Sequence, residues 1–181
     1  MSFSQLHVPL LALLVCERNL KFLTVLFHPV GLSLQLHFFL FLLTESKKSL
    51  LIAEYTRSVL YHVDMETDPN RAVPLPIDEI LGLTAVGFDP IDQKIYYGEL
   101  GRSIIRRSYL NGTADETIIN GVYFVNRLAI DYINRNIYYT DSQRNKIDVA
   151  AVSGLHRTTL LLTTAPEGIA LDLKNGYVIF H

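Results

Sequence analysis

The chain of 181 residues is long enough for one domain, and its net charge of −2 provides no basic field for nucleic acid. A single cysteine excludes an internal disulfide and a zinc site built from thiolates. Hydrophobic residues make up 49% of the chain and are concentrated in its first 44 residues, whereas most charged residues follow.

Residues 1–44 form an apolar leader outside the pattern of the rest of the chain. Residues 8–16 resemble the core of a secretory signal, although no basic residue precedes them and no small-x-small cleavage site follows. Residues 22–43 are long enough to span a bilayer but include His28 and Pro29, which are costly in lipid. Three interpretations stay open: a signal peptide or anchor, a segment not native to the folded domain, and a buried helix of the domain.

From residue 50 onward, short runs of β-branched and aromatic residues between turn residues predict a succession of β-strands. A proline-rich loop with an irregular outer strand is expected over residues 66–76. The other expected strands are 50–54, 58–64, 83–89, 94–98, 103–110, 116–120, 127–131, 136–140, 146–152, 157–162, 168–172 and 177–180. The turns Asn111-Gly112 and Ser153-Gly154 each join the third strand of a set of four to the fourth.

Two landmarks repeat at one spacing, 42 and then 41 residues (131 − 89 and 172 − 131): Asp89, Asp131 and Asp172, and Tyr97, Tyr139 and Phe180. A β-rich repeat of about 40–45 residues is typical of a propeller blade with four antiparallel strands. We therefore expect an all-β partial propeller with two complete blades and a part blade on either side. Because propellers avoid exposed edges by closing, we interpret the chain as a fragment of a larger protein.

The stretches 95–99 (Ile-Tyr-Tyr-Gly-Glu) and 137–141 (Ile-Tyr-Tyr-Thr-Asp) resemble the Tyr-Trp-Thr-Asp repeats of the low-density-lipoprotein receptor class B propeller. The resemblance covers residues 50–181 and implies a six-bladed propeller. Members of the family include lipoprotein receptors, receptor-related proteins with Wnt co-receptor function, nidogen and the epidermal growth factor precursor. A leader that runs straight into the propeller is similar to the Wnt co-receptor type.

The chain departs from the family pattern at its most characteristic residues. The tryptophan is replaced by Tyr97, Tyr139 and Phe180, and the terminal acid is Glu99 in one repeat and Asp141 in the next. The motif is structural in that family, so an aromatic replacement keeps its packing role. Tyrosine pairs at 96–97 and 138–139 are accordingly expected to pack between blades rather than to bind carbohydrate.

The repeated aspartates, Asp89, Asp131 and Asp172, allow two interpretations. They could form a ring of carboxylates around a channel cation, or each could end a strand and accept hydrogen bonds from the following turn. Their presence in every repeat favours the turn. Asn111-Gly112-Thr113 is the only Asn-x-Ser/Thr sequon, which makes Asn111 a candidate glycosylation site in a secreted protein.

A candidate ligand-binding face follows from the strand order, because the start of each first strand and the turn between the second and third strands emerge on the same side. The residues expected there are Leu100, Arg102, Tyr123, Phe124, Asn126, Ser142, Gln143 and Arg144. Aromatic residues beside polar groups are typical of protein-binding patches, and the same face binds protein ligands in the resembled family. Gly101 and Gln143 lie where an acidic ring would need carboxylates, and the alternative of solvated turns stays open.

The sequence contains no catalytic constellation and no glycine-rich phosphate loop, and we expect neither a metal nor a cofactor. The rival from another class is a calcium-dependent hydrolase of the lactonase kind, with ligands at the strand starts. Asn126 is its candidate ligand, but the counterparts Thr84 and Glu167 do not complete a consistent set.

The favoured interpretation is a non-enzymatic, extracellular, protein-binding propeller of a cell-surface receptor-related protein, in Wnt co-receptor signalling or ligand endocytosis. A nidogen-like matrix protein is the alternative. Expected partners are secreted signalling or matrix proteins, not nucleic acid. Attachment to the extracellular side of the plasma membrane would run through the leader or through downstream segments.

Overall fold

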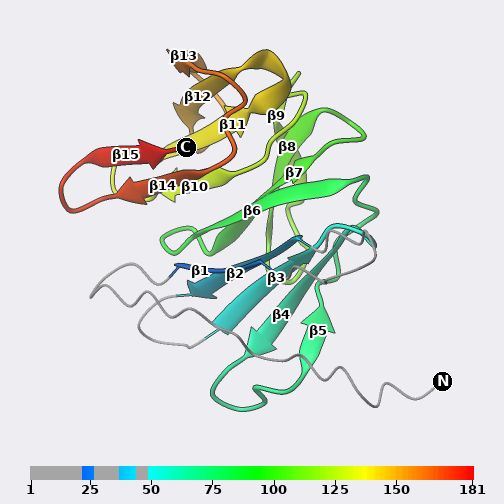
Figure 1. The fold of residues 1–181 in the computed structure, drawn as a ribbon. Coiled ribbons are helices and arrows are strands. Elements are labelled where there is room, and N and C mark those ends of the chain that lie inside the picture. Colours follow the sequence, from blue (N-terminus) through cyan, green and yellow to red (C-terminus); the bar gives the residue numbers. More distant parts are fainter. Residues whose placement is uncertain (1–21, 27–36, 44–48) are drawn as a thin grey trace.

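The computed structural model describes residues 22–26, 37–43 and 49–181, and in this part of the chain it consists of β-strands in four antiparallel sheets with one short 3₁₀ helix (Figure 1). Within each sheet every strand pairs with the next one along the chain. This arrangement confirms the expected all-β propeller architecture.

The strand bounds fall into four sets, which we call blades 1 to 4. Blade 1 contains β2 (His37–Leu43), β3 (Ser49–Glu54), β4 (Val59–Asp64) and β5 (Ala72–Pro74), with β1 (Phe22–Leu26) added beside β2. Blade 2 contains β6 (Leu83–Asp89), β7 (Lys94–Glu99), β8 (Ile104–Tyr109) and β9 (Glu116–Asn120). Blade 3 contains β10 (Leu128–Asp131), β11 (Asn136–Asp141), β12 (Lys146–Ala151) and β13 (Thr158–Leu162), with the 3₁₀ helix η1 (Ser142–Arg144) after β11. Blade 4 contains β14 (Ile169–Asp172) and β15 (Tyr177–Phe180).

The strands expected beyond residue 76 are all present, with ends shifted by one residue at most. The first blade is more complete than the sequence indicated, because β2 lies inside the expected leader and pairs with β3 from Phe38↔Glu54 to Leu43↔Ser49. A continuous apolar run such as residues 38–43 looks the same in a buried strand and in a leader, so its period could not separate them. The rest of the leader lies outside the described residues, and its role stays a prediction.

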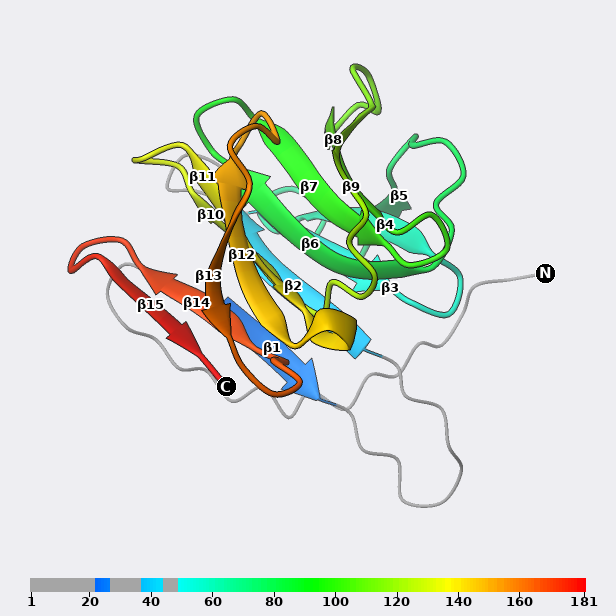
Figure 2. The ribbon, with the colours of Figure 1, turned by 90° about the horizontal axis from the view of Figure 1, so that it is seen from above.

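The inner strands β2, β6, β10 and β14 are neighbours in space, so the blades are arranged as an arc around one axis (Figure 2). Gly87 shows how closely two of them approach. A Cβ at Gly87 would lie 2.4 Å from Leu128 Cδ1 and 3.3 Å from Ile130 Cγ1. A glycine in β6 therefore allows β10 to pack directly against its backbone.

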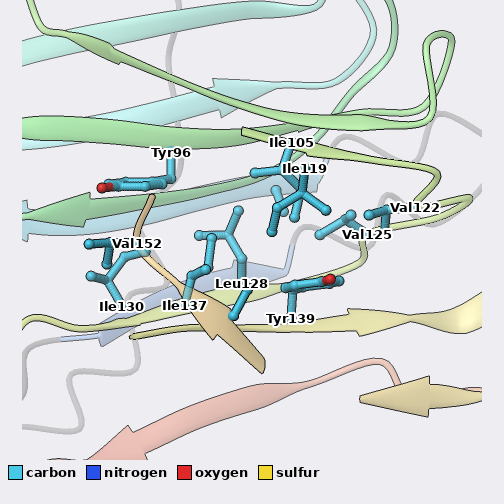
Figure 3. Close-up of a cluster of buried hydrophobic side chains, with 12 residues drawn as sticks. Tyr96, Ile105, Ile119, Val122, Val125, Leu128, Ile130, Ile137, Tyr139 and Val152 are labelled. Atoms are coloured by element: carbon cyan, nitrogen blue, oxygen red, sulfur yellow. The ribbon is translucent and has the colours of Figure 1, made fainter. Parts of the chain in front are cut away.

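Two hydrophobic clusters fill the spaces between blades, and the tyrosine pair of β7 contributes to both. Tyr96 belongs to the cluster between blades 2 and 3, whereas Tyr97 belongs to the cluster between blades 1 and 2. Successive side chains of a strand point to opposite faces, so adjacent tyrosines reach the two neighbouring blades. Tyr139 repeats the position of Tyr97 and packs against blade 2 (Figure 3). Tyr97 and Tyr139 thus act as the expected inter-blade packing residues, while Phe180 in blade 4 is 43% exposed.

The repeated aspartates make the turn hydrogen bonds expected of them. In each turn the aspartate Oδ1 accepts from a backbone N–H two or three residues later. The donors are Ile91 for Asp89 at 2.9 Å, Asn134 for Asp131 at 2.9 Å and Asn175 for Asp172 at 3.1 Å. The side-chain amides of Asn134 and Asn175 also donate to their aspartates. A carboxylate used in this way closes the turn between the first and second strands of each blade.

A polar network surrounds the hydroxyl of Tyr97 inside blade 2. The hydroxyl donates to Asp115 Oδ1 at 2.6 Å, and Asp115 also forms a short ion pair with Arg106. The Arg106 guanidinium lies 5.5 Å from the centre of the Tyr97 ring. Burial raises the pKa of Tyr97, and its bond to Asp115 adds to the shift, so the phenol stays neutral.

Blade 3 has the same arrangement with the two charges exchanged. Here the acid, Asp148, is on β12 at the position of Arg106, and the base, Arg157, precedes β13 at the position of Asp115. Arg157 Nη2 lies 2.8 Å from Asp148 Oδ2, and its guanidinium lies 5.6 Å from the centre of the Tyr139 ring. Both blades therefore place one acid and one arginine beside the buried tyrosine, but the strand positions of the acid and the arginine are exchanged.

Candidate ligand-binding face

The candidate face is the edge of the arc where each second strand turns into the third. The pairs Leu83↔Glu99 and Leu128↔Tyr139 place the start of a first strand beside the end of a second strand in blades 2 and 3. The face consists of the turns 100–103 and 142–145 and of the connectors 77–82 and 121–127 between blades.

Tyr123 and Arg144 form the most prominent contact of this face. The Arg144 guanidinium lies 4.2 Å from the centre of the Tyr123 ring, and Arg144 Nη1 donates to the carbonyl of Gly121 at 2.9 Å. The tyrosine is still 44% exposed. An aromatic ring and a cation are therefore presented together at the surface in one fixed arrangement.

The backbone beneath this pair is held by bonds that join three parts of the chain. Ser142 N–H donates to the carbonyl of Phe124 at 3.0 Å, which fastens η1 to the connector. Asn126 Nδ2 donates to Ser142 Oγ at 2.8 Å, and Ser142 Oγ donates to the carbonyl of Pro166 in the next connector at 2.6 Å. Asn126 and Ser142 thus link blade 3 to blade 4, and this face is stiffened from below.

Leu100 and Arg102 lie one blade earlier, in an equivalent but differently charged unit. Leu100 N–H donates to Gly82 O at 2.8 Å, and Arg102 Nη1 donates to Glu79 O at 2.9 Å, as Arg144 does to Gly121 O. Arg102 additionally lies 2.5 Å from the buried carboxylate of Glu99. Its charge is therefore largely matched within the chain.

The corresponding carboxylate in blade 3 is one methylene shorter. Asp141 is buried and accepts from the backbone N–H of Phe124 at 3.4 Å. Arg144 contacts the Tyr123 ring and the carbonyl of Gly121, on the surface side. In blade 2 the buried Glu99 thus pairs with Arg102, whereas in blade 3 Arg144 contacts Tyr123 and Gly121.

The eight residues predicted for this face therefore fall into two units. Tyr123, Phe124, Asn126, Ser142 and Arg144 are brought together, with Gln143 exposed beside them, while Leu100 and Arg102 belong to the unit of blade 2. The prediction missed Glu79 and the carbonyl of Pro166. Glu79 lies 42 residues before Gly121, so the repeat spacing was a signal that could have found it.

Arg127 lies at the inner end of the same connector. Its Nη1 donates to the carbonyl of Asn126 at 2.9 Å. Burial lowers the pKa of Arg127 to about 10, with a partial opposing effect from the charge of Glu167. A partly buried cation therefore lies at the end of the connector, directly before β10.

Two adjoining cavities of about 360 and 200 Å³ border the connector between blades 1 and 2. Both are lined by Asp78 and Glu79. The larger adds the charged pair Arg102 and Arg106, and the smaller adds aliphatic side chains such as Leu75 and Ile77.

The hydrolase alternative depends on three positions at the strand starts. Asn126 donates to Ser142, Thr84 is buried, and Glu167 is exposed. Among the described residues no group of three or more histidine, cysteine, aspartate or glutamate side chains is placed to hold a metal ion. Within the same residues no helix is long and apolar enough to cross a membrane.

No protein-family model matches the sequence. Low-density lipoprotein receptor-related protein 5 of Mus musculus is 33% identical over 99 residues, which cover 52% of this chain and 6% of that protein. Low-density lipoprotein receptor-related protein 4 of Homo sapiens is 30% identical over 81 residues, 44% of this chain and 4% of that protein. The chain thus spans only a small part of the length of these relatives.

Among solved structures, a chain of the nidogen/laminin complex superposes with a TM-score of 0.66 at 26% identity, covering 73% of this chain and 52% of that one. Together with the two relatives, this similarity supports repeats of the receptor-related class B type. A streptogramin B lyase superposes with a TM-score of 0.62 at 15% identity, covering 82% of this chain and 49% of that one, and this likeness concerns the fold alone. At the positions where the class B pattern has tryptophan, this chain carries Tyr97, Tyr139 and Phe180.

Proposed function

We propose that this chain is a protein-binding propeller segment of an extracellular, cell-surface receptor-related protein, and that it engages a secreted ligand through the candidate face. The observation that carries the proposal is the Tyr123–Arg144 pair, exposed above a hydrogen-bonded support. Similarity to two receptor-related proteins supports the receptor type. Wnt co-receptor signalling or ligand endocytosis is the role that we propose for it.

Tyrosine and arginine are the residue types that dominate protein interfaces energetically. Their contribution is largest when they are held in the bound geometry beforehand, because less side-chain entropy is lost on association. The bond from Arg144 to Gly121 and the bonds through Ser142 supply this preorganisation. The face therefore combines the composition and the stiffness of a binding site.

The chemistry of the ligand follows from the exposed guanidinium. Arginine carries five N–H donors and no acceptor, and one of the Arg144 donors is used on Gly121. A ligand segment that offers a carboxylate or backbone carbonyls beside an apolar group would match Arg144 and Tyr123 together.

A second candidate is a nidogen-like matrix-binding role. It is favoured by the superposition on a chain of the nidogen/laminin complex, which is similar over 73% of this chain. In that case the same face would meet a matrix protein, and the chain would belong to a matrix component instead of a receptor.

We also propose that the chain is not an enzyme. Asn126, the residue that a lactonase-type calcium site would use, has its amide donated to Ser142 as part of the support of the face. This bond gives Asn126 a structural role in its present position.

The test is a binding series by biolayer interferometry with the full chain immobilised. A purified Wnt protein probes the receptor proposal, and laminin probes the matrix alternative. Tyr123→Ala is expected to weaken binding about tenfold or more, as for a central interface aromatic.

The matched control is Tyr109→Ala on the opposite edge. Tyr109 is 37% exposed and has a cation at a similar place, since Lys94 Nζ lies 5.0 Å from its ring centre. This variant should bind as the wild type does. If the two substitutions weakened binding equally, the candidate face would not be the ligand-binding site. If neither probe bound, the result would count against both the receptor role and the matrix role.

A further inference from the structure

We propose that Asn111 carries an N-linked glycan, at the edge of the arc opposite the candidate ligand-binding face. Asn111 and Thr113 are both exposed in the connection between β8 and β9, residues 110–115. Asn111-Gly112-Thr113 is the only sequon in the 181 residues. The inference rests on the proposed function in one respect, which is passage of the chain through the secretory pathway.

The sequon has a defined local geometry. Thr113 Oγ1 donates to Asn111 Oδ1 at 2.7 Å, and the backbone N–H of Thr113 donates to the same oxygen at 3.1 Å. Both bonds engage the carbonyl oxygen of the Asn111 amide and leave Nδ2 out of the turn's hydrogen bonds. Nδ2 is the atom that a glycan modifies.

The neighbouring blade shows which parts of this turn the fold requires. Gly112 and Gly154 occupy equivalent positions and both have positive φ, +77° and +87°. The residues that flank Gly154 are Ser153 and Leu155, not asparagine and threonine. In blade 3, Ser153 Oγ accepts from the backbone N–H of Leu155 at 3.5 Å, as Asn111 Oδ1 accepts from Thr113. The fold therefore uses a glycine and a side-chain acceptor before it, and because serine also supplies that acceptor, the turn does not by itself require the Asn-x-Thr pattern.

The position is compatible with ligand binding on the other edge. Connections between third and fourth strands leave the blade at the end opposite the turns 100–103 and 142–145, since β8 runs away from its turn towards Tyr109. A glycan on Asn111 would thus cover the outer part of blade 2 and leave Tyr123 and Arg144 uncovered.

The modification itself is a group transfer. Asn111 Nδ2 forms a bond to the anomeric carbon of an oligosaccharide carried on a lipid diphosphate, and the bond from that carbon to the diphosphate oxygen breaks. The amide loses one proton and the lipid diphosphate leaves.

The test is translation of the full chain behind a cleavable secretory signal in the presence of microsomes. Only chains protected from added protease, and therefore inside the lumen, are compared on gels with and without peptide N-glycosidase. The wild type and Thr113→Ser should each show one glycosidase-sensitive shift, and Asn111→Gln and Thr113→Ala should show none.

A gain-of-site variant tests the role of the turn. Ser153→Asn with Leu155→Thr places a sequon at the equivalent position of blade 3 and should add a second shift. Protected wild-type chains without a shift would overturn the glycan proposal while leaving the binding proposal intact. A glycosylated chain that binds neither a Wnt protein nor laminin would support the glycan proposal and count against the binding proposal.

Discussion

At the scale of single residues, two glycines hold the outer connections of one blade against the blade before it. A Cβ at Gly112 would lie 1.8 Å from the carbonyl oxygen of Pro76, and a Cβ at Gly154 would lie 1.9 Å from that of Ile118. Both positions also have positive φ. Any side chain there would meet backbone that cannot rotate away.

We expect Gly154→Ala to lower the free energy of unfolding by about 2–3 kcal/mol, since it adds a backbone clash to the cost of a left-handed conformation. Gly176→Ala is the control, because Gly176 has φ +73° with nothing within 4 Å of the added Cβ. Its cost should be about 1 kcal/mol. Urea unfolding measures the loss of unfolding free energy in both variants. Equal losses would show that the close approach of Gly154 to Ile118 does not contribute to stability.

The two buried tyrosines should respond differently to loss of their hydroxyls. Tyr97 donates to Asp115 at 2.6 Å, whereas Tyr139 donates to Asp148 at 3.4 Å. Removing the shorter bond in Tyr97→Phe should cost about 1–2 kcal/mol in unfolding free energy, and Tyr139→Phe should cost less than about 1 kcal/mol. A larger loss for Tyr139→Phe in urea unfolding would contradict this ranking.

At the scale of strands, the exchanged charges of blades 2 and 3 predict how acid affects stability. Burial alone would raise the pKa of Asp148, but hydrogen bonds from Lys146, Arg157 and Thr159 outweigh it and lower the pKa. A lowered pKa in the folded state contributes stability above the unfolded value of about 3.9, and this stability is lost as the pH falls through the folded value.

We therefore expect the difference in unfolding free energy between the wild type and Asp148→Asn to be largest near neutral pH and to narrow below about pH 4. The control substitution is Asp78→Asn, which removes a carboxylate from an exposed position. Chemical unfolding at a series of pH values measures both differences. A constant difference for Asp148→Asn from pH 7 to pH 3 would contradict the role given to its ion pairs.

The strands themselves were largely readable from the sequence. The spacing of 42 and 41 residues between Asp89, Asp131 and Asp172 reflects a turn that each blade must close. Runs of β-branched and aromatic residues between turn residues predicted the strands beyond residue 76. Strand β2 was not readable, because residues 38–43 lack any alternation. The connection expected around Asn111-Gly112 is present as residues 110–115, and Gly112 in it fits against the backbone of Pro76.

The candidate face was only partly readable for a related reason. Strand order placed Tyr123 and Arg144 in neighbouring turns, but it could not give the side-chain directions that stack them at 4.2 Å. The exchange of charges between Arg106–Asp115 and Asp148–Arg157 depends on contacts between strands that are adjacent in space. Such pairs become visible in sequence only after the blades are aligned at their repeat.

At the scale of the whole molecule, the two edges of the arc present different kinds of residues and turns. One edge presents Tyr123 and Arg144 on connectors tied together by Ser142, and the other carries the aspartate-closed turns and the sequon at Asn111. This division separates a surface suited to a protein ligand from a surface suited to a glycan.

Hydrogen–deuterium exchange of the full chain, free and bound to whichever secreted probe it captures, tests this division most directly. We predict that binding slows exchange at backbone amides in residues 121–127 and 142–145 and leaves residues 90–93 and 110–115 unchanged. Protection of the turns 90–93 and 110–115, with none at Tyr123 and Arg144, would place the ligand on the opposite edge and contradict the proposed face.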